Sequence, residues 1–472
     1  MMDNKHKPKR TTYRTRLNEM VTTLRNDILT GKLQPDSFLP SELVLADQFQ
    51  LSKDSIRKGL AILLEEHMIE KVPRIGTRVI GPGIIDKITM RLGYYRSLET
   101  EAELVALVEK FQQLHPHFAI QLIPIEFDWY LSPNMRGALE QNAFDLITIN
   151  HQHIESFLES EENLQLLEPL DRKALTYPFL LSPFSKDNVL YAQPLIFSPI
   201  FLCYNREHFR AAALPEPDSS WRWPDLCQAA MHLTQPRSHV GISFQLPSIN
   251  RWPLFLLQNQ VQFKRDIQGR LILENDNFKE ALKLSLSMFE GLQSKSFFHS
   301  GGDADSAMYF ANQKASMIIT SYFNLNYLRN VDFDYDITPL PYMREASTQL
   351  LISGMAVLKA SKHKEAAKAL VDFLVSDEAQ LHIRKHTLSI PSNKIIAEET
   401  TGDELFRRPS RFFMYKDIIP TYRFYSDMNI SYREASAMGE ILKLYWAHLD
   451  DFETALRRLK EALESSAQYS AT

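Results

Sequence analysis

The chain has 472 residues, of which 44% are hydrophobic, and it carries a formal net charge of −5. This length exceeds one ordinary domain, and the hydrophobic content excludes a wholly disordered chain. Because no run of about 18 apolar residues occurs and the N-terminus is charged throughout, we expect no membrane span, no secretion signal and a cytoplasmic location.

The first 80 residues are basic, whereas the rest of the chain is acidic. Residues 1–80 hold 14 Lys or Arg against 10 Asp or Glu, a net charge of +4, and the remaining 392 residues have a net charge of −9. Residues 1–12 form a basic tail, either solvated or lying on phosphates. Apolar residues then recur at helical spacing over residues 13–33. The charge distribution favours nucleic acid as the partner of the N-terminal end.

Residues 39–60 predict two short helices joined by a tight turn. The first begins after Pro40 with Ser41 as its N-cap, and the second is capped by Ser52. Such a pair is typical of a DNA-binding helix-turn-helix, although an ordinary amphipathic hairpin with solvated charges has the same pattern. The start of the second helix carries side chains suited to phosphates and guanine edges, namely Ser52, Lys53, Ser55 and Arg57.

Residues 64–80 end the second helix and then alternate around Gly76, which predicts a two-stranded wing. Arg74 and Arg78 flank Gly76 at the expected tip, where a wing lies against the DNA backbone or minor groove. Residues 13–80 therefore predict a complete winged-helix DNA-binding domain. The Gly-Pro-Gly sequence that follows predicts a linker over residues 81–86.

These segments resemble the DNA-binding domain of the GntR family of bacterial transcription regulators. The resemblance is carried by residues 28–35, 39–42, 51–60 and 76–77. It implies that the positions of Ser52, Lys53, Ser55 and Arg57 contact double-stranded operator DNA, and that the regulator binds paired half-sites as a homodimer. The chain departs from the family at Leu43, where an Arg is frequent, and at Arg74, which replaces the first of two wing glycines. The operator sequence therefore does not transfer.

Residues 87–465 alternate between predicted strands and helices. Extended segments at 88–93, 119–125 and 145–149 flank helical segments at 102–114 and around Leu139. This periodicity predicts an α/β domain with parallel strands. The expected fold is thus multidomain, with an N-terminal winged helix-turn-helix that is mainly α with a β-wing, followed by an α/β domain.

The same region resembles the extracellular solute-binding proteins of ABC importers, specifically the family 1 sugar-binding proteins. Matching segments lie at 111–116, 144–147, 166–170, 191–195, 201–206, 310–317, 337–341, 353–357 and 365–378. Their order spans nearly all of residues 87–465 and is more specific than any one segment. The resemblance implies a periplasmic-binding-protein-like domain of two lobes that close on a carbohydrate about a hinge. We place chain crossings between the lobes near Pro194 and Ser353.

A sugar requires aromatic faces for its rings and planar polar groups for its hydroxyls. The residues that fit by type and position are Trp129, Asn150, Arg251, Trp252 and Tyr322. Trp129 and Asn150 follow predicted strands, whose carboxyl ends face the cleft in such sheets. Trp252 and Tyr322 match aromatic positions that often stack on sugars in the family, with core packing as the alternative. Ile249 stands where sugar binders often carry a further aromatic, so the identity of the ligand stays open.

The sequence predicts neither an enzyme nor a cofactor. It contains no Gly-rich phosphate loop, no GxSxG and no HExxH, so no catalytic residue is assigned. His115 with His117, and His151 with His153, form His-x-His pairs, but neither pair has the accompanying carboxylate or Cys cluster that would complete a metal site. We therefore assign no metal site.

Two functions remain. The favoured one is a DNA-binding transcription regulator controlled by a small-molecule effector, a sugar or oligosaccharide, bound between the lobes. The other is a DNA-binding scaffold whose α/β domain mediates protein contacts without a ligand. The first predicts that a small molecule changes operator affinity, and the second predicts an empty or blocked cleft. Residues 13–80 disfavour a stand-alone transport protein.

Overall fold

The computed structural model describes residues 13–29, 32–80, 87–132, 134–291, 297–299, 302–400 and 405–469. The expected basic tail at residues 1–12 and the expected linker at 81–86 lie outside these ranges. Internal contacts divide the chain into two compact units, one of Met1–Met90 with Val108–Gln121 and one of Arg91–Leu107 with Leu122–Thr472. No helix of the described residues is long and apolar enough to cross a membrane.

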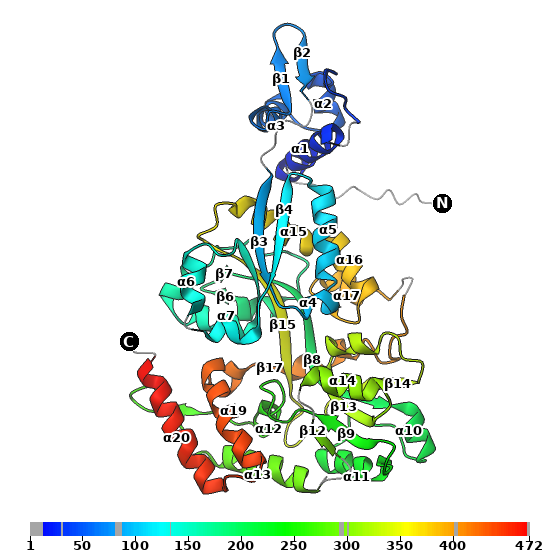
Figure 1. Cartoon of the computed structure of the whole chain (residues 1–472), viewed down its shortest axis with the longest axis vertical. Coiled ribbons are helices and arrows are strands. Elements are labelled where there is room, and N and C mark those ends of the chain that lie inside the picture. Colours follow the sequence, from blue (N-terminus) through cyan, green and yellow to red (C-terminus); the bar gives the residue numbers. More distant parts are fainter. Residues whose placement is uncertain are drawn as a thin grey trace, which may run out of the picture. The chain divides into compact units, whose positions relative to one another are not determined.

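The N-terminal elements form a winged helix. They are α1 (Tyr13–Leu29), α2 (Glu42–Gln48), α3 (Lys53–Glu65), β1 (Ile69–Val72) and β2 (Gly76–Val79), drawn in shades of blue in Figure 1. The side chain of Ser41 accepts a hydrogen bond from the backbone N–H of Val44, and that of Ser52 accepts one from Ser55. Both predicted N-caps are therefore confirmed. Helix α1 covers Tyr13–Leu29 of the segment in which apolar residues recur at helical spacing, and residues 30 and 31 lie outside the described ranges.

Helix α3 packs against α1 at Gly59. A Cβ atom on Gly59 would lie 2.1 Å from the Cε of Met20, so a side chain at this position would force the Met20 side chain to move. The core around this contact is apolar and includes Met20, Leu24, Ile28, Leu45, Ile56, Leu60, Leu63 and Val79. Because the buried face of α3 is fixed by this packing, its opposite face is left to solvent.

The chain from residue 88 onward builds a mixed sheet whose main path runs β12-β9-β13-β8-β15-β5-β3-β4, and β3 and β4 lie partly in the smaller unit. These strands are β3 (Ile88–Tyr94), β4 (Phe118–Pro124), β5 (Leu146–Asn150), β8 (Gln193–Asn205), β9 (Val240–Phe244), β12 (Phe297–His299), β13 (Ala315–Ser321) and β15 (Thr348–Val357). Strand β3 pairs with β5 in parallel, as do β9 and β13, but β8 and β15 are antiparallel to each other. The predicted parallel pairing is therefore present, but the sheet also contains antiparallel pairs that the sequence analysis did not predict.

The long strands β8 and β15 explain this difference. They pass between the two lobes in opposite directions (Figure 1). A chain that crosses from one lobe and returns must run antiparallel, a constraint that no local pattern in the sequence contains. Pro194 pairs with Gly354, at a register shift next to Ser353. Both positions expected at the crossings thus lie in the crossing strands.

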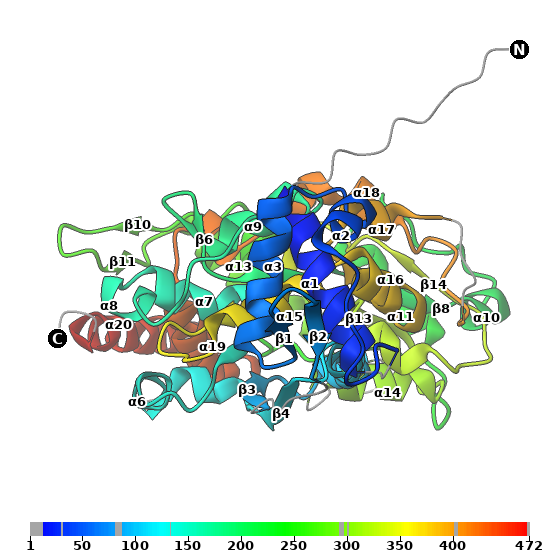
Figure 2. The ribbon, with the colours of Figure 1, turned by 90° about the horizontal axis from the view of Figure 1, so that it is seen from above.

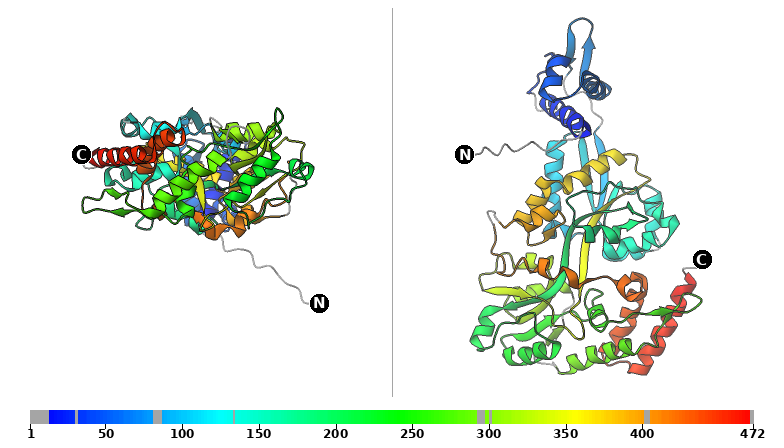
Figure 3. Two further views of the ribbon diagram at one scale, coloured as in Figure 1. Left: turned by 90° about the horizontal axis from the view of Figure 1, so that it is seen from below. Right: turned by 180° about the vertical axis from the view of Figure 1, so that it is seen from behind.

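Helices cover the sheet in each lobe. The first lobe carries α4 (Leu98–Glu101), α6 (Asn134–Glu140), α7 (His151–Leu158), α15 (Lys364–Leu374) and α16 (Asp377–His386). The second lobe carries α10 (Arg206–Ala211), α11 (Trp223–Leu233), α12 (Pro253–Gln258), α13 (Asp276–Gly291), α14 (Asp303–Ala311), α19 (Tyr432–Trp446) and α20 (Phe452–Tyr469). Helix α5 (Leu104–Leu114) crosses the boundary between the two compact units. Helices α19 and α20 lie side by side at one edge of the second lobe (Figures 2 and 3).

Shorter elements complete the fold. They are α8 (Glu161–Leu164), α9 (Pro178–Leu181), α17 (Lys394–Glu398), α18 (Met414–Asp417), β6 (Ser185–Lys186), β7 (Val189–Leu190), β10 (Lys264–Arg265), β11 (Leu271–Ile272), β14 (Tyr335–Thr338), β16 (Ile390–Pro391) and β17 (Tyr422–Arg423), with 3-10 turns η1 (Phe127–Leu131), η2 (Ser182–Phe184), η3 (Asn324–Leu328), η4 (Ile419–Thr421) and η5 (Tyr425–Met428).

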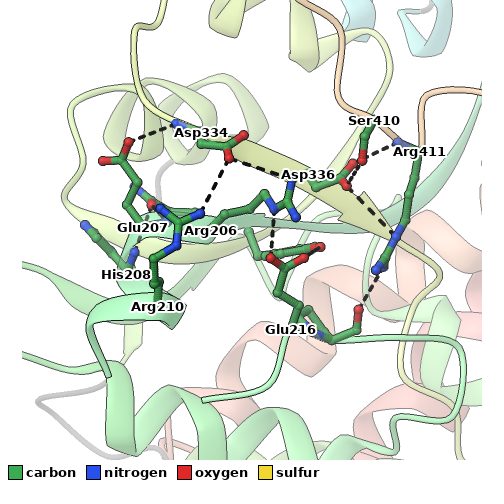
Figure 4. A network of polar contacts seen from close by, with 12 residues as sticks. Arg206, Glu207, His208, Arg210, Glu216, Asp334, Asp336, Ser410 and Arg411 are labelled. Carbon is green, nitrogen blue, oxygen red and sulfur yellow. Dashed lines mark hydrogen bonds and ion pairs between the residues drawn. The ribbon is translucent and has the colours of Figure 1, made fainter. Parts of the chain in front are cut away.

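Residues 405–413 make a third connection between the lobes. In the first lobe, the guanidinium of Arg408 donates to the carbonyl oxygens of Arg384 and Thr387. In the second lobe, Ser410 and the backbone N–H of Arg411 donate to the buried carboxylate of Asp336. Figure 4 shows Asp336, on β14, and Asp334, just before that strand, among Arg206, Arg411 and Ser410. The segment is therefore held by charge-assisted hydrogen bonds at both ends.

Candidate functional site

The exposed face of α3 carries the cations that a DNA groove requires. Lys53, Arg57 and Lys58 are all exposed. The Nε of Arg57 lies 2.9 Å from a carboxylate oxygen of Glu42, and its Nη1 lies 3.8 Å from one of Asp54. Lys58 was not among the predicted contacts, although it is exposed and directly follows Arg57.

Ser52 and Ser55 are engaged with each other at the start of α3. Their hydroxyl oxygens lie 2.6 Å apart, and the backbone N–H of Ser55 donates to the Ser52 oxygen at 3.3 Å. Ser55 is only 3% exposed. The pair therefore fixes the start of α3, and the direct DNA contact predicted for Ser55 stays a prediction that its burial does not favour.

The wing tip is formed by residues 73–75, between β1 and β2. Arg74 is exposed and has a φ of 63°, and Gly76 has a φ of 150°. Arg78 lies in β2, where its guanidinium binds the carboxylate of Glu70 and lies 3.2 Å from that of Asp36. Arg74 is therefore the cation at the tip, whereas Arg78, predicted to share the tip, is held along the hairpin.

A cavity of about 280 Å³ lies between the two lobes and is called here the central cavity. It is lined by Ser97, Glu101, Phe127, Asn150, His151, Gln152, Asn250, Asp303, Ser321, Phe323, Asn324, Leu351, Ile352 and Ser353. These residues come from the first lobe, from the second lobe and from β15, which crosses between them. A ligand in this cavity would touch both lobes and the hinge region.

Asn150 is the one predicted ligand residue that lines the central cavity. It ends β5 and caps α7, because its Oδ1 accepts the backbone N–H groups of Gln152 and His153 at 3.0 and 2.7 Å. This leaves the amide nitrogen as the side-chain group not used in capping. The carboxyl end of β5 thus faces the cavity, as expected for such a sheet.

Phe127 and Phe323 are the phenylalanines that line the central cavity, and Trp129 does not line it. Phe127 is 48% exposed, and its ring stacks on Tyr95 with centroids 4.5 Å apart. Trp129 packs edge-on against Tyr130 and Phe144, and it does not line the cavity. Both residues lie in η1, where a difference of two positions turns a side chain away from the cleft. A sequence with three aromatics in four positions does not reveal which one faces the ligand.

Trp252 and Tyr322 are placed in the core. Both are 0% exposed. The indole of Trp252 is so closely covered by α19 that a Cβ on Gly439 would lie 3.0 Å from its Nε1, and the Tyr322 hydroxyl donates to the carbonyl of Phe412 at 2.7 Å. Neither residue lines the central cavity. Their predicted stacking on a sugar stays a prediction, and the structure supports the packing alternative.

Arg251 acts behind the central cavity. It is 1% exposed, and its guanidinium lies 3.0 Å from the carboxylate of Asp303, which lines the cavity. Burial lowers the pKa of Arg251 and raises that of Asp303, while the charge of each partner opposes these shifts. Arg251 therefore holds Asp303 at the cavity wall.

Glu101 adds a second carboxylate to the wall of the central cavity. Burial raises its pKa to about 7, and a hydrogen bond with Ser97 partly opposes this shift. Because no sequence motif marks Glu101, only its place at the end of α4 identifies it. Near neutral pH the Glu101 carboxyl group is therefore present both in its protonated form, which donates a hydrogen bond, and as an anion.

A second cavity, of about 300 Å³, is called here the lateral cavity. It is lined by His151, Glu155, Leu158, Glu159, Ser182, Pro183, Phe424, Tyr425 and Ser426. His151 lines both cavities. Glu155 accepts the backbone N–H of Tyr432 at 2.7 Å, and burial raises its pKa to about 7.

His151 stands at the junction of the two cavities with one ring nitrogen unused. Its Nδ1 accepts the backbone N–H of Ile352 at 3.2 Å, whereas its Nε2 has no hydrogen-bond partner. Burial lowers its pKa to about 3, so the ring is neutral at pH 7. Because Nδ1 is an acceptor, the proton is assigned to Nε2, which is a donor in need of an acceptor.

The lobes also contact each other directly beside His151. The side-chain nitrogen of Gln152 on α7 donates to Asn250 and to the Tyr425 hydroxyl, each at 2.8 Å. That hydroxyl donates to the carbonyl of Ile249 at 2.6 Å. A small molecule bound here would affect contacts that join one lobe to the other.

Residues 97–381 match the family model of bacterial extracellular solute-binding proteins. The chain belongs to this family. Residues 18–79 match the bacterial regulatory proteins of the gntR family, so the winged helix is a GntR-type domain. The chain therefore combines two modules, and both predicted resemblances are confirmed.

Curated relatives match the N-terminal part. The uncharacterized HTH-type transcriptional regulator YieP of Escherichia coli is 30% identical over 120 residues, which cover 25% of this chain and 48% of that protein. The HTH-type transcriptional repressor NagR of Bacillus subtilis is 36% identical over 64 residues, 14% of this chain and 26% of that protein. The chain thus spans about half or less of these relatives' length.

Solved structures match the solute-binding part. The ABC substrate-binding protein Lmo0181 of Listeria monocytogenes, in complex with cycloalternan, has a TM-score of 0.67 and 18% identity over 81% of this chain and 99% of that one. Maltose-bound MalE3 of T. maritima has a TM-score of 0.67 and 14% identity over 80% of this chain and 99% of that one. At these identities the similarity shows the fold alone.

The described residues contain no group of three or more His, Cys, Asp or Glu side chains that could hold a metal ion. His151 and His153 serve other contacts, since Nδ1 of His153 bonds the Tyr95 hydroxyl at 2.7 Å.

Proposed function

We propose that the chain is a DNA-binding transcription regulator whose operator affinity is controlled by a small molecule bound between the lobes of its solute-binding domain. The central cavity carries this proposal, because it is lined by both lobes and by the crossing strand β15. A GntR-type domain in the same chain supplies the DNA-binding part. We place the protein in the cytoplasm, where it would act as a homodimer on paired half-sites.

A carbohydrate is the proposed ligand. Phe127 offers a ring face for a sugar ring, while Asn150, Glu101 and Asp303 offer polar groups for hydroxyls. The similar solved structures contain cycloalternan and maltose, which supports the same ligand class here. Trp252 and Tyr322 are left out of the proposed contact set, since they are buried in the core.

The proposed DNA contacts are made by α3 and the wing. Lys53, Arg57 and Lys58 enter or border the major groove, and Arg74 contacts the backbone or minor groove from the wing tip. Ser52 acts through its cap of α3. These residues lie within the span that matches the gntR family.

Ligand control would act through lobe closure. A ligand that binds the closed arrangement better than the open one shifts the population toward closure by its difference in affinity. Gln152 and Tyr425 would strengthen or lose their contacts across the lobes during this movement. The route to DNA is proposed to run through residues 81–86, and a flexible insertion there should uncouple ligand binding from operator affinity.

The experiment that tests this function has two readouts on the full chain. Thermal unfolding against a panel of mono- and oligosaccharides finds ligands of the folded state, because these raise the melting temperature. Operator binding is then measured with and without each hit, on DNA selected by the protein from a random library. We expect at least one hit to change operator affinity by about fivefold or more. Hits without any effect on DNA, or no hit in a broad panel, would favour the scaffold alternative.

A further inference from the structure

The two cavities form one potential binding region. His151 lines both, and the neighbouring residues Asn150 and Gln152 line the central cavity while Tyr425, bonded to Gln152, lines the lateral one. Aromatic side chains line both cavities, Phe127 and Phe323 in the central one and Phe424 and Tyr425 in the lateral one. A ligand that extended from the central cavity past His151 would therefore reach the lateral cavity.

The combined lining is acidic. Glu101 and Asp303 line the central cavity, and Glu155 and Glu159 line the lateral cavity, whereas neither lining includes a Lys or Arg. Arg251 lies behind the wall and is paired with Asp303. The lateral cavity therefore has one carboxylate on α7, Glu155, and one directly after the end of that helix, Glu159. Its lining contains no Lys or Arg, although Arg433 and Arg265 act on Glu159 from outside it. This excess of carboxylates in the lining favours a positively charged ligand group there.

A second observation at the same place points to a ligand. His151 is 6% exposed, and its Nε2 has no hydrogen-bond partner. An N–H donor buried without a partner is costly, and a hydroxyl or ring oxygen of a ligand between the cavities would satisfy it. A neutral imidazole also adds no positive charge that would offset the carboxylates.

We infer that the ligand is an aminated oligosaccharide of at least two rings, with one ring on Phe127 in the central cavity, a hydroxyl or ether oxygen at His151, and an ammonium group between Glu155 and Glu159 in the lateral cavity. This inference rests on the proposed function and adds the charge and length of the ligand. The ring faces of Phe127 and Phe424 favour a saccharide over a flexible polyamine, because stacking rewards a rigid ring.

Calorimetric titration of the full chain tests this with four probes: the disaccharide of β-1,4-linked glucosamine, its N-acetylated form, cellobiose and spermidine. We expect the glucosamine disaccharide to bind about tenfold or more tightly than the two neutral disaccharides, as one partly buried charge pair allows. The preference should decrease at high salt.

Variants locate the ammonium group. Glu155→Gln and Glu159→Gln should each reduce the preference for the glucosamine disaccharide about fivefold or more while changing cellobiose binding less than twofold. Glu109→Gln, at an exposed carboxylate that lines neither cavity, is the matched control and should change nothing. His151→Phe should weaken the binding of both the glucosamine disaccharide and cellobiose, since it removes a hydrogen-bond donor that the two ligands share.

Each outcome separates the inference from the proposed function. Equal binding of charged and neutral disaccharides would overturn the inference and leave a sugar-controlled regulator intact. Spermidine binding as tightly as the disaccharide, and competing with it, would overturn the saccharide assignment. Tighter binding of the glucosamine disaccharide without any change in operator affinity would support the inference and count against ligand control of DNA. No binding of any probe would count against the inference.

Discussion

The DNA-binding surface and the region between the lobes use charge in opposite ways. On α3 and the wing, Arg57 and Arg74 are exposed and lie within 18 positions of each other in the sequence. Between the lobes, Glu101, Asp303 and Glu155 line cavities and come from distant segments. Solvent screens the first set, so each residue acts nearly alone, whereas burial strengthens the second set and makes its members depend on one another. Substitutions should therefore have larger effects between the lobes.

The largest effect is expected at Arg251. Arg251→Ala leaves the carboxylate of Asp303 without its cation, and at pH 8 the free energy of unfolding should fall by about 3 to 5 kcal/mol. Urea denaturation followed by circular dichroism measures the loss. Arg251→Ala with Asp303→Ala should recover part of it, because the unpaired charge is gone.

The matched control for that ion pair is exposed. Arg270 and Asp266 form a pair at 2.7 Å in which the arginine side chain is 44% exposed. Arg270→Ala should cost less than about 1 kcal/mol, as screened pairs do. If the two arginine substitutions had equal effects, the contrast between buried and exposed charge would fail.

Arg57 should give the next largest effect, on DNA rather than on stability. Arg57→Ala should weaken operator binding by about 1 to 3 kcal/mol if the guanidinium reads a base edge. Arg57 must break its ion pairs with Glu42 and Asp54 to make this contact, which reduces the net contribution of the contact to DNA affinity. Fluorescence anisotropy with operator and with unrelated DNA measures both affinities. An equal loss on both would show a phosphate contact instead.

The pH dependence of stability sharpens the comparison further. Burial lowers the pKa of His151 and His153 from 6.5 to about 3, so both bind protons more readily when unfolded and stability is lost as pH falls below 6.5. Burial raises the pKa of Glu101 and Glu155 from 4.5 to about 7, so their protonation stabilises the fold as pH falls from 7 to 4.5.

The two pairs therefore oppose each other between pH 6.5 and 4.5. Replacing Glu101 and Glu155 by Gln removes the stabilising pair, so the variant should lose about 2 kcal/mol more than the wild type for each replaced carboxylate across this interval. Chemical denaturation at a series of pH values checks the difference. Parallel pH profiles for the variant and the wild type would show that neither carboxylate is buried enough to matter.

Local signals in the sequence predicted the N-terminal structure well. The caps at Ser41 and Ser52 depend on a side chain and a backbone N–H only three residues away, so the sequence specifies them directly. The antiparallel pairing of β8 with β15 joins residues about 150 positions apart, and no local pattern records it. The order of the family segments was enough to predict the fold. It did not predict the directions of the paired strands.

The ligand region shows the same limit for single residues. Asn150 was found because it ends a strand, and strand ends have a known place in such sheets. Phe127 was missed because Trp129 is the larger aromatic nearby, and Trp252 and Tyr322 were selected by type although both pack in the core. Glu101 becomes notable only when its surroundings raise its pKa. The surroundings of a side chain in the folded protein decide these roles, and the residue type alone does not reveal those surroundings.

The smallest effect is expected at the wing tip. There the backbone conformation affects stability, whereas the charge affects the salt dependence of DNA binding. Arg74 adopts a left-handed φ of 63°, which costs a residue with a Cβ about 1 kcal/mol relative to glycine. Arg74→Gly should relieve this strain, but the gain is partly cancelled by the greater freedom of glycine in the unfolded chain, so stability should change by less than about 1 kcal/mol. DNA binding should weaken, and the slope of log K against log salt should decrease in magnitude by about one. Arg74→Lys separates the two causes, because it keeps the charge and the strain and should leave the salt slope unchanged. A lower slope in the lysine variant would mean that the guanidinium acts through its shape, so the wing tip would no longer behave as an independent, screened charge.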